Sequence, residues 1–457
     1  MKPFQVGLLG AGVVGGGTFA VLQRNQEEIR RRAGREIRIA HVVDVDLARA
    51  RSVAGDAAEV GNDARAVIAR PEVDAVIELI GGTGIARTLV LEAIAAGKHV
   101  VTANKALLAV HGTEIFAAAR ENGVVVAFEA AVAGGIPIIK ALREGLTANR
   151  IEWIAGIVNG TTNFILSEMR EKRIDFQAAL ADAQRHGYAE ADPTFDIAGI
   201  DAAHKATIMS AIAFGIPVRF DRAHVEGIVD LQAADIAYAE QLGYRIKLLA
   251  ITKRRDDLGD PSAAAGASNG KATGGIELRV HPTLVPASRL IANVEGAMNA
   301  VMVQADAVGT TLYYGKGAGA EPTASAVIAD LVDITRLHTA DPDHRVPHLA
   351  FQPGSMQDTP ILPIEAVVTS FYLRLQVADQ TGVLARITGI LADNDISIDA
   401  LLQRPSQHAA AEGAPRTDVI ILTHDTVEGR MTTAIAQMQV LPTVLAPIIR
   451  IRKEELS

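Results

Sequence analysis

The feature that most restricts the fold of this chain is a glycine pattern directly after its first apolar segment. Residues 4–10 read FQVGLLG and predict a short buried strand, and a helix reaching about Arg32 is predicted soon after it. Gly10, Gly12 and Gly15 fall between them at the spacing Gly-x-Gly-x-x-Gly. Such glycines permit a tight turn and a close backbone approach to a pyrophosphate, which the helix N-terminus then faces. An ordinary glycine-rich turn is the alternative, but the place between strand and helix predicts a dinucleotide-binding unit.

Strands and helices alternate through the rest of this region. A second strand, IRIAHVVD, is predicted to end at Asp44, and VDAVIELI and KHVVTA predict further buried strands. The segment VVVAFEAAVAGGIP closes the region. This alternation indicates an α/β fold with a parallel, doubly wound sheet of the Rossmann type.

The cofactor is expected to lie along the glycine turn and the end of the second strand. Val13 and Val14 stand inside the turn, and Asp44 stands where an acid can hold the adenine ribose 2′-hydroxyl of NAD. Arg49 and Arg51 follow, and they either meet the 2′-phosphate of NADP or lie on an exposed helix face. NAD and NADP therefore both remain open.

The pattern changes at about residue 150 to a mixed α+β arrangement. IEWIAGIVNG, LGYRIKLLAITKR, IELRVHP and NAVMVQADAVG predict strands, with long helices between and after them. Residues 256–275 are rich in Gly, Ala and Ser and predict a loop without an assigned function. Residues 322–338 predict a helix that has Pro322 near its start, where proline is tolerated, and that returns to the first domain.

The last part of the chain predicts a small domain of its own. Residues 371–452 follow the order βαββαβ, which makes a ferredoxin-like unit. This unit resembles an ACT domain, a module that binds amino acids, although Thr381 replaces the proline often found before the glycine of that family. The positions that carry the resemblance are Asp379, Gly382, Val383, Leu384 and Asn394. It implies either an amino-acid effector such as threonine or a tail that serves only oligomerisation.

The richest chemical pattern is AQRHGYAEADPTFDIAGIDAAHK, residues 183–205. Asp201 and Lys205 lie four apart on a predicted helix and so share one face. A carboxylate beside an ammonium can hold a proton near a reacting oxygen. The alternative is a surface ion pair worth under about 1 kcal/mol. The dense spacing of glycine, proline and acidic residues around the pair favours a site.

This segment closely resembles the signature of the homoserine dehydrogenase family. The matching positions are Ala183, Gly187, Asp192, Pro193, Asp196, Gly199, Asp201 and Lys205. The resemblance implies reversible NAD(P)-dependent hydride transfer between L-homoserine and L-aspartate 4-semialdehyde in threonine, methionine and isoleucine biosynthesis, with amino-acid feedback through the C-terminal domain. Two alternatives stay open, another NAD(P)-dependent amino-acid alcohol or aldehyde dehydrogenase and a non-catalytic amino-acid sensor.

The resemblance also implies the residues of the catalytic centre. Asp201 and Lys205 would act at the substrate hydroxyl, assisted by Lys105 from the segment VTANKALL, whose alternative role is a solvated helix lysine. Thr102 and Asn104 of that segment would contact the cofactor. The segment GKGAGAEPTASAV, residues 315–327, predicts a second glycine-rich loop, in which Gly315 and Gly317 would touch the nicotinamide half.

The substrate is a zwitterion and needs partners for both of its charges. Glu190 is the candidate acceptor for the ammonium, and Asp196 is grouped with it as a substrate ligand. The turn VNGTTN opens a predicted helix, so Gly160 and Thr161 can offer backbone N–H groups to the carboxylate. The alternative for this turn is an ordinary threonine helix cap.

The segment FEAAVAGGIPII, residues 128–139, resembles the family's monovalent-cation loop. By that match Glu129, Val132, Gly134 and Ile136 would offer oxygens, mostly backbone carbonyls, to sodium or potassium. A tight Gly-Gly-x-Pro turn between domains is the alternative.

The resemblance covers nearly the whole chain and implies its organisation as a homodimer or homotetramer. Residues 1–135 and about 316–345 would bind the dinucleotide, and residues 136–315 would form the catalytic and dimerisation domain. A polar, proline-rich linker would follow at residues 346–370, and an ACT-like regulatory domain at residues 371–457.

Bulk properties exclude several other classes of protein. The 457 residues carry a net charge of −9, which argues against nucleic-acid binding, and the absence of cysteine excludes disulfides and Cys-ligated zinc. No apolar run reaches the about 20 residues that span a bilayer, so no membrane contact is expected. The N-terminus leads directly into a strand without a secretory signal. A cytoplasmic protein is therefore expected.

Overall fold

A computed structural model describes residues 2–256, 274–405 and 415–456, so the predicted loop 256–275 lies outside the described residues from 257 to 273. The chain packs as two compact units. The first consists of Met1–Gly160, Ile200–Ala223 and Ala297–Thr359, and the second of Thr161–Gly199, His224–Gly296 and Pro360–Ser457. Across the described ranges, no helix has the length and apolar character needed to span a membrane.

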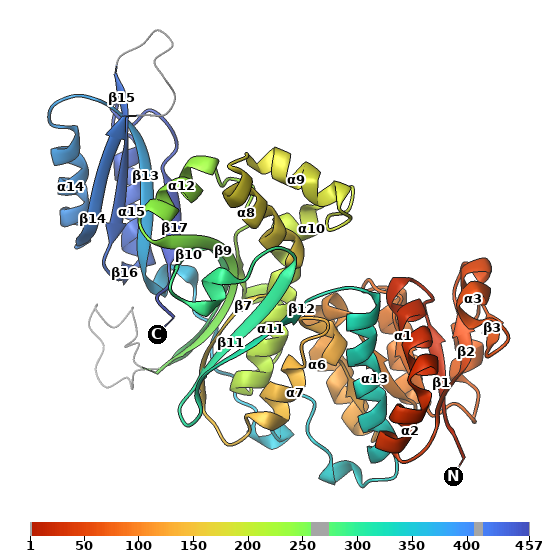
Figure 1. The fold of residues 1–457 in the computed structure, drawn as a ribbon. Coiled ribbons are helices and arrows are strands. Elements are labelled where there is room, and N and C mark those ends of the chain that lie inside the picture. The colour runs from red at the N-terminus through yellow and green to blue at the C-terminus, as the bar shows by residue number, and fades with distance from the viewer. Residues whose placement is uncertain (1, 257–273, 406–414, 457) are drawn as a thin grey trace. The chain divides into compact units, whose positions relative to one another are not determined.

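The first unit opens with a six-stranded parallel sheet (Figure 1). Its strands, in the spatial order β3-β2-β1-β4-β5-β6, are β3 (Glu59–Gly61), β2 (Ile37–Val43), β1 (Phe4–Leu9), β4 (Ala75–Glu78), β5 (His99–Thr102) and β6 (Val126–Ala127). All neighbouring pairs are parallel. This order is that of dinucleotide-binding folds and confirms the Rossmann-type sheet, although the short strand β3 was not predicted.

Helices connect these strands. They are α1 (Val13–Arg24), α2 (Gln26–Ala33), α3 (Leu47–Ala54), α4 (Ala64–Ile68), α5 (Ile85–Ala95) and α6 (Lys105–Glu121). The single helix predicted to reach about Arg32 is broken at Asn25, whose backbone is not helical (φ −107°, ψ 17°). Asn25 ends α1 and begins α2, because asparagine tolerates the non-helical conformation that a cap requires.

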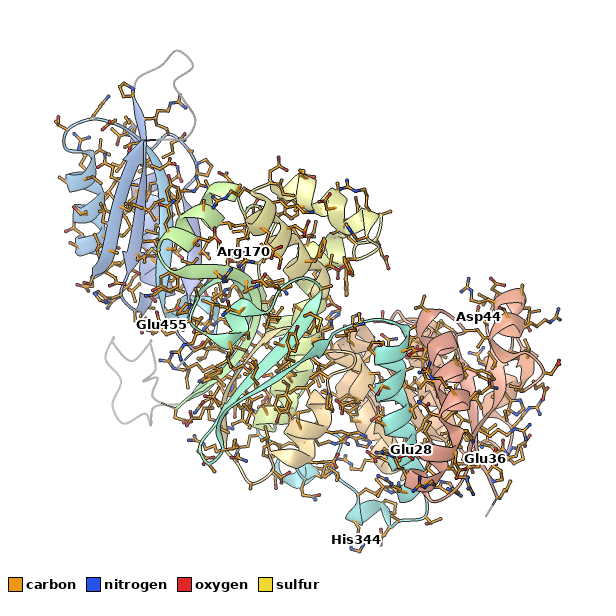
Figure 2. The ribbon with its side chains drawn as sticks, viewed as in Figure 1. Glu28, Glu36, Asp44, Arg170, His344 and Glu455 are labelled. Carbon is orange, nitrogen blue, oxygen red and sulfur yellow. The ribbon has the colours of Figure 1, made fainter. Side chains whose placement is uncertain are left out.

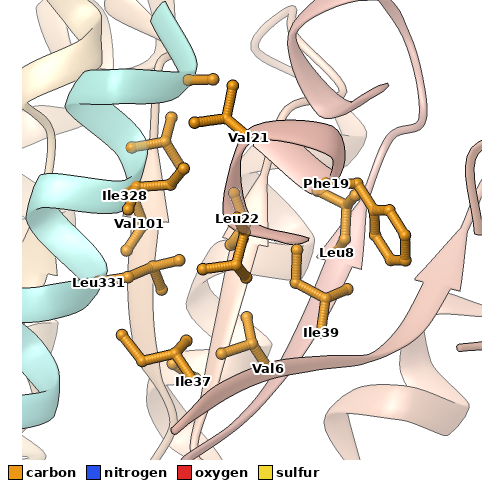
Figure 3. Packing of buried hydrophobic residues seen from close by; sticks show 14 of the residues in the cluster. Val6, Leu8, Phe19, Val21, Leu22, Ile37, Ile39, Val101, Ile328 and Leu331 are labelled. Carbon is orange, nitrogen blue, oxygen red and sulfur yellow. The ribbon is translucent and has the colours of Figure 1, made fainter. Parts of the chain in front are cut away.

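A late segment of the chain completes this core. The helix α13 (Ala320–Leu337) packs against α1, and its Ile328 and Leu331 lie beside Val21 and Leu22 (Figure 3). Leu331 is fully buried and Leu22 is 3% exposed. Burying one such side chain stabilises the fold by about 1.5–3 kcal/mol. The return of α13 to the sheet is therefore driven by apolar burial.

The first unit also contains an antiparallel layer and a buried helix. The strands β7 (Ile151–Ile157), β11 (Met298–Ala305) and β12 (Gly309–Lys316) pair in the order β7-β11-β12. The start of the predicted glycine-rich loop, residues 315 and 316, is thus the end of a strand. The short helix α7 (Ile138–Lys140) and the helix α11 (Ile200–Phe214) complete the unit. Every residue of α11 after Ile200 is buried, including the polar Asp201, His204 and Lys205 in its first two turns.

The second unit combines helices with a mainly antiparallel sheet. Its helices before the tail are α8 (Gly160–Lys172), α9 (Phe176–Arg185), α10 (Thr194–Ile197) and α12 (Ala233–Gln241). The strands β9 (Tyr244–Arg255) and β10 (Gly275–Pro286) form a long antiparallel pair, and β8 (His224–Val225) pairs with β10 in parallel.

The tail folds as the predicted βαββαβ unit. Its elements in chain order are β13 (Val368–Ala378), α14 (Val383–Asp393), β14 (Ile398–Pro405), β15 (Arg416–Thr423), β16 (Thr426–Val427), α15 (Glu428–Gln439) and β17 (Ile449–Lys453). The main strands lie antiparallel in the order β17-β13-β15-β14. The strand β17 also pairs in parallel with β10, so the two sheets of this unit are continuous.

The junction between β10 and β17 buries charged side chains. Arg452, 1% exposed, donates to Glu428 Oε2 and Glu226 Oε2, each at 2.7 Å. Arg279, also 1% exposed, donates to Glu277 Oε2 and to Glu454 Oε1 at 2.6 Å. Each arginine thus bridges two carboxylates, which offsets the cost of removing its charge from water.

Candidate active site

An aspartate held by two lysines lies in the first unit. On α11, Lys205 Nζ is 2.6 Å from Asp201 Oδ2 and donates a second bond of 2.6 Å to the Val158 carbonyl oxygen. At the start of α6, Lys105 Nζ is 3.1 Å from Asp201 Oδ1. Asn159 Nδ2 donates to Asp201 Oδ2 at 2.8 Å. The end of β7 and the starts of α6 and α11 therefore bring one carboxylate and two ammonium groups together.

Burial separates this cluster from an ordinary ion pair. The side chains of Asp201 and Lys205 are 5% and 10% exposed, whereas that of Lys105 is 35% exposed. Burial alone would raise the pKa of Asp201, but Lys205, Lys105 and the hydrogen bonds of Lys205 and Asn159 lower that pKa well below its usual range. Asp201 is thus ionised, and the exposed ion pair considered as the alternative is not what the structure contains.

Two neighbours of the cluster were not singled out from the sequence. Asn159 stands directly before the Gly160–Thr161 turn. Its place in the segment VNGTTN, next to predicted substrate ligands, could have marked it as a site residue. His204 follows Asp201 by three residues and packs edge-on against Phe220, with ring centroids 4.3 Å apart. Burial and the nearby Lys105 and Lys205 lower the pKa of His204 to about 4 against the opposing charge of Asp201, so the ring is neutral at physiological pH.

Two of the three glycines in the turn between β1 and α1 are required by sterics, and the third faces open space. Gly10 has φ +101°, and a Cβ atom there would lie 2.6 Å from the Leu79 carbonyl oxygen. A Cβ atom at Gly15 would lie 2.1 Å from the Gly10 carbonyl oxygen, so the helix packs on the turn only without a side chain. A Cβ atom at Gly12 would meet no atom within 4 Å. The open face at Gly12, beside the 75% exposed Val13, is where a pyrophosphate can approach the backbone.

A cavity of about 420 Å³ adjoins this turn and fits the adenosine half of a dinucleotide. Gly10, Gly12, Asp44 and Arg49 are among its lining residues. Figure 2 labels Asp44, which follows β2; its Oδ2 accepts a hydrogen bond of 2.8 Å from the Ala11 amide. Burial opposes the charged form of Asp44, but hydrogen bonds from the amides of Asp46 and Ala11 lower its pKa. A carboxylate and a guanidinium thus line one cavity, and their contacts with a cofactor stay a prediction.

Thr102 and Asn104 shape the loops that lead to Lys105. The Thr102 hydroxyl donates to Glu78 Oε2 at 2.7 Å and accepts from the Asn104 amide at 2.9 Å. Asn104 Oδ1 caps α6 through the Leu107 amide, and its Nδ2 donates to the Gly82 carbonyl oxygen at 2.7 Å. Glu78, fully buried at the end of β4, was not singled out from the sequence, although an acid at the end of a buried strand was a visible sign.

Gly315 and Gly317 are needed for packing. A Cβ atom at Gly317 would lie 1.9 Å from Asn299 Nδ2, and one at Gly315 would lie 3.1 Å from Ile136 Cγ1. These contacts explain the glycines without a cofactor. Their contact with the nicotinamide half stays a prediction.

The predicted cation loop is a tight turn in the first unit. Ala133 and Gly134 both have left-handed backbones, with φ of 55° and 50°. The Glu129 carboxylate is buried and accepts the amides of Ile139 and Lys140 at 2.9 and 2.8 Å, so this side chain serves the start of α7. Any cation oxygens from this loop would therefore be backbone carbonyls.

The carbonyl oxygens of the four predicted cation ligands differ in their partners. Those of Glu129 and Ile136 accept the amides of Val132 at 3.4 Å and Ile138 at 2.8 Å. Those of Val132 and Gly134 accept no hydrogen bond from any residue that the structure describes.

The remaining predicted residues belong to, or open, the second unit. Glu190 is exposed, and Asp196 is half-buried in α10. Gly160 starts α8, where a Cβ atom would lie 2.8 Å from the Ala297 carbonyl oxygen. The Thr161 hydroxyl donates to the Tyr188 carbonyl oxygen at 2.7 Å, so it does not cap its own helix. That Glu190 and Asp196 bind the same substrate molecule as Lys205 and Lys105 stays a prediction.

Comparison with known proteins gives matches along the whole chain. The family models described as "Homoserine dehydrogenase, NAD binding domain", "Homoserine dehydrogenase" and "ACT domain" match residues 10–129, 137–332 and 371–438. A curated homoserine dehydrogenase of Pseudomonas aeruginosa is 56% identical over 459 residues, which cover 100% of both chains.

Solved structures agree with these matches. The crystal structure of a homoserine dehydrogenase from Thiobacillus denitrificans aligns with a TM-score of 0.91 at 61% identity, covering 100% of this chain and 99% of that one. A hyperthermophilic archaeal homoserine dehydrogenase in complex with NADPH aligns with a TM-score of 0.60 at 25% identity, covering 74% of this chain and 99% of that one.

Proposed function

The chain belongs to the homoserine dehydrogenase family, and on that premise we propose that Lys205, Asp201 and Lys105 carry the proton transfer of its reaction. That reaction interconverts L-homoserine and L-aspartate 4-semialdehyde with a nicotinamide cofactor. The observation that carries the proposal is the buried Asp201 carboxylate between two ammonium groups. Such a cluster holds a charged donor in a fixed direction at low solvent exposure.

When the cofactor is bound, its nicotinamide would supply or take up the hydride. In the reductive direction negative charge grows on the substrate oxygen, and the Lys205 ammonium stabilises this charge and donates the proton. In the oxidative direction the same amine receives the proton. Asp201 and the Val158 carbonyl fix the direction of the amine, and the more exposed Lys105 assists.

For the cofactor we propose NADP, with NAD also accepted. Arg49 would face the 2′-phosphate of NADP, and Asp44 would hold the free ribose hydroxyl of NAD. Arg49→Ala should then raise KM for NADP and leave KM for NAD nearly unchanged. Asp44→Ala should do the reverse, and equal effects on both cofactors would contradict these roles.

For the substrate charges we propose Glu190 as the partner of the ammonium and Asp196 as a further substrate ligand. The amides of Gly160 and Thr161, at the start of α8, would receive the carboxylate. Glu190→Gln should raise KM for homoserine more than it lowers kcat, because a binding contact acts in the ground state as well as in the transition state. An unchanged KM would remove Glu190 from this role.

We further propose that a sodium or potassium ion binds the backbone carbonyls of Glu129, Val132, Gly134 and Ile136. The two carbonyl oxygens without hydrogen bonds, those of Val132 and Gly134, support this proposal. Hard oxygen donors suit such ions. Activity in a buffer of bulky organic cations should fall and recover on adding KCl or NaCl, and full activity without either salt would contradict the site.

The organisation of the chain is proposed along the same lines. Residues 1–135 with about 316–345 bind the dinucleotide, and residues 136–315 carry catalysis and dimerisation. Residues 346–370 form a linker to residues 371–457. This last domain binds a regulatory amino acid, and threonine is the first candidate. The ACT-type fold of the tail supports a small-molecule effector. We propose a homodimer or homotetramer, which light scattering of the full chain distinguishes.

The experiment that tests the proposed function is a steady-state assay of homoserine oxidation with NAD and with NADP, each with and without threonine. Close analogues of homoserine are included, because faster turnover of one of them would favour another amino-acid alcohol dehydrogenase. Absence of turnover with all of them would favour a sensor. Unchanged rates with threonine, together with no heat of threonine binding, would remove threonine as the effector.

A further inference from the structure

A cavity of about 910 Å³ lies within the second unit. One wall is the segment from Glu226 to Ala234, which leads into α12, together with Pro282 of β10. The other wall comes from the ACT-type tail, through the strands β13, β15 and β17 and the helix α15. Its volume is in the range of small-molecule sites, which span about 300–1,000 Å³.

A buried carboxylate with an unused oxygen stands in this lining. Asp418 of β15 is 5% exposed, and its Oδ2 accepts a bond of 3.1 Å from the Tyr238 hydroxyl. Its Oδ1 accepts no hydrogen bond from the residues that the structure describes. Leaving a buried polar atom without a partner costs about 1–3 kcal/mol, and more for a charged group. Oδ1 is itself closed to solvent, so a ligand's donor reaches it only when the side chains around it shift, and that contact then removes this cost.

The charge balance of the lining favours a cationic donor. Arg374 and Arg450 line the cavity, but Arg374 already binds both Asp235 oxygens at 2.6 and 3.1 Å, and Arg450 binds Glu226 at 3.2 Å. Asp418 and the exposed Asp230 also line it, and neither forms an ion pair within the described ranges, although the Asp418 carboxylate attracts the nearby Arg374 guanidinium. The surplus charge is therefore negative, which selects an ammonium over a second anion.

The rest of the lining is largely aliphatic. It includes Leu231, Ile435, Ala446, Ile448 and Ile449. We propose that this cavity binds a free α-amino acid with an aliphatic side chain. Its ammonium meets Asp418, and its side chain packs on the aliphatic wall. Its carboxylate lies toward Arg374 and Arg450 and shares their guanidinium groups with Asp235 and Glu226. The regulatory meaning of this site, but not the binding itself, rests on the effector role proposed above for the tail.

This site differs from the exposed loop through which the tail resembles amino-acid-binding ACT domains. That loop holds Asp379 after β13 and Gly382 before α14, and Asp379 is exposed. Asp379 and Asp418 lie near the same end of the antiparallel β13–β15 pair, where β13 finishes and β15 starts, but only Asp418 is buried. Asp379→Asn is therefore the matched control for Asp418→Asn, which keeps an acceptor for Tyr238 and replaces the unused oxygen by an N–H donor.

The test is titration calorimetry of the full-length protein with isoleucine, valine, methionine and threonine. Isobutylamine and isobutyrate are the probes that lack one of the two charged groups. We expect at least one amino acid to bind more tightly than either probe. Asp418→Asn should weaken that binding at least about tenfold, as expected for loss of a charged hydrogen bond, whereas Asp379→Asn should change it less than about twofold.

A second variant keeps the proposal testable if Asp418→Asn fails to fold. Ala446→Trp fills the cavity from a half-buried loop position and leaves the buried charges in place, and it should also weaken binding. No heat with any of the amino acids would overturn the proposal, as would binding that is lost in Asp379→Asn and kept in the two cavity variants. Because calorimetry needs no turnover, failure of the dehydrogenase assay would be distinguishable from failure of this site.

Discussion

Asp201 meets two ammonium groups and one amide, and each partner comes from a different stretch of the chain. The spacing of Asp201 and Lys205 was readable in the sequence, because helix geometry places residues four apart on one face. The approach of Lys105 was implied only by family resemblance. The Asn159 amide and the Val158 carbonyl were missed, because local patterns do not encode contacts across more than forty residues.

Lys205→Met should lower kcat by about three orders of magnitude, because the variant keeps the side-chain length but loses both the charge and the proton at the substrate oxygen. NADPH fluorescence titration should give an unchanged Kd. The control is Lys98→Met, which removes another buried lysine, one that donates only to the carbonyls of Arg70 and Val73. Turnover by Lys205→Met within tenfold of the unmodified protein would refute the assignment.

Asp330 makes stability depend on pH in an unusual direction. It accepts the Glu129 amide at 2.8 Å, and burial, with Glu129 nearby and Lys140 opposing, raises its pKa to about 7 from an unfolded value of 3.8. Between these values the folded chain holds a proton that the unfolded chain has lost. The free energy of unfolding therefore falls as pH rises through this window, by up to about 4 kcal/mol.

Asp330→Asn keeps the acceptor for the Glu129 amide and removes the titration. Urea unfolding between about pH 4 and pH 8 should show the variant gaining stability relative to the unmodified protein as pH rises. A difference in unfolding free energy that stays constant across this range would show that Asp330 does not titrate there.

At the scale of elements, the turn between β1 and α1 shows which features a local sequence pattern can predict. Its glycine spacing, the strand before it and the helix after it were all predicted, because each depends on neighbours within a few residues. The break at Asn25 and the strand β12 were not predicted. The strand needs its pairing with β11, in which Asn299 lies opposite Gly315.

Two glycine variants of this turn should fail in different ways. Gly12→Ala adds a methyl group to open space, so the thermal midpoint should hardly change, while KM for the cofactor rises because the pyrophosphate loses its close approach. Gly15→Ala forces a Cβ atom to within 2.1 Å of the Gly10 carbonyl oxygen and should lower the thermal midpoint by several degrees. Equal loss of stability in the two variants would contradict the open space at Gly12, and an unchanged cofactor KM in Gly12→Ala would mean that this face is not the cofactor side.

At the scale of the molecule, the three fold types were readable from the order of strands and helices, and they are confirmed. The buried charges that tie the tail to β10 were not readable. Arg279, Arg452 and their glutamates look like surface residues in the sequence, since arginine and glutamate are rarely buried unless paired. Only the pairing of β17 with β10 removes them from water.

Arg452→Leu should therefore destabilise the protein by about 3–5 kcal/mol, because it leaves Glu226 and Glu428 buried without their shared partner. The measurement is the midpoint of urea unfolding at constant pH. Arg30→Ala breaks the exposed pair with Glu27 and serves as the control, with an unchanged midpoint. A variant of Arg452 as stable as the control would mean that these charges contribute nothing to the junction.

The continuous sheet through β10 and β17 also bears on how such a tail can be exchanged during evolution. A tail whose strand pairs with β10 is not easily exchanged, because its removal by recombination would expose the edge of β10 and leave buried charges unpaired on both fragments. Successful transfer to another enzyme would require a recipient strand of the same direction with complementary carboxylates. Lineages that carry this arrangement should therefore inherit both parts together, and substitutions among the buried charges of β10 and β17 should occur in matched pairs.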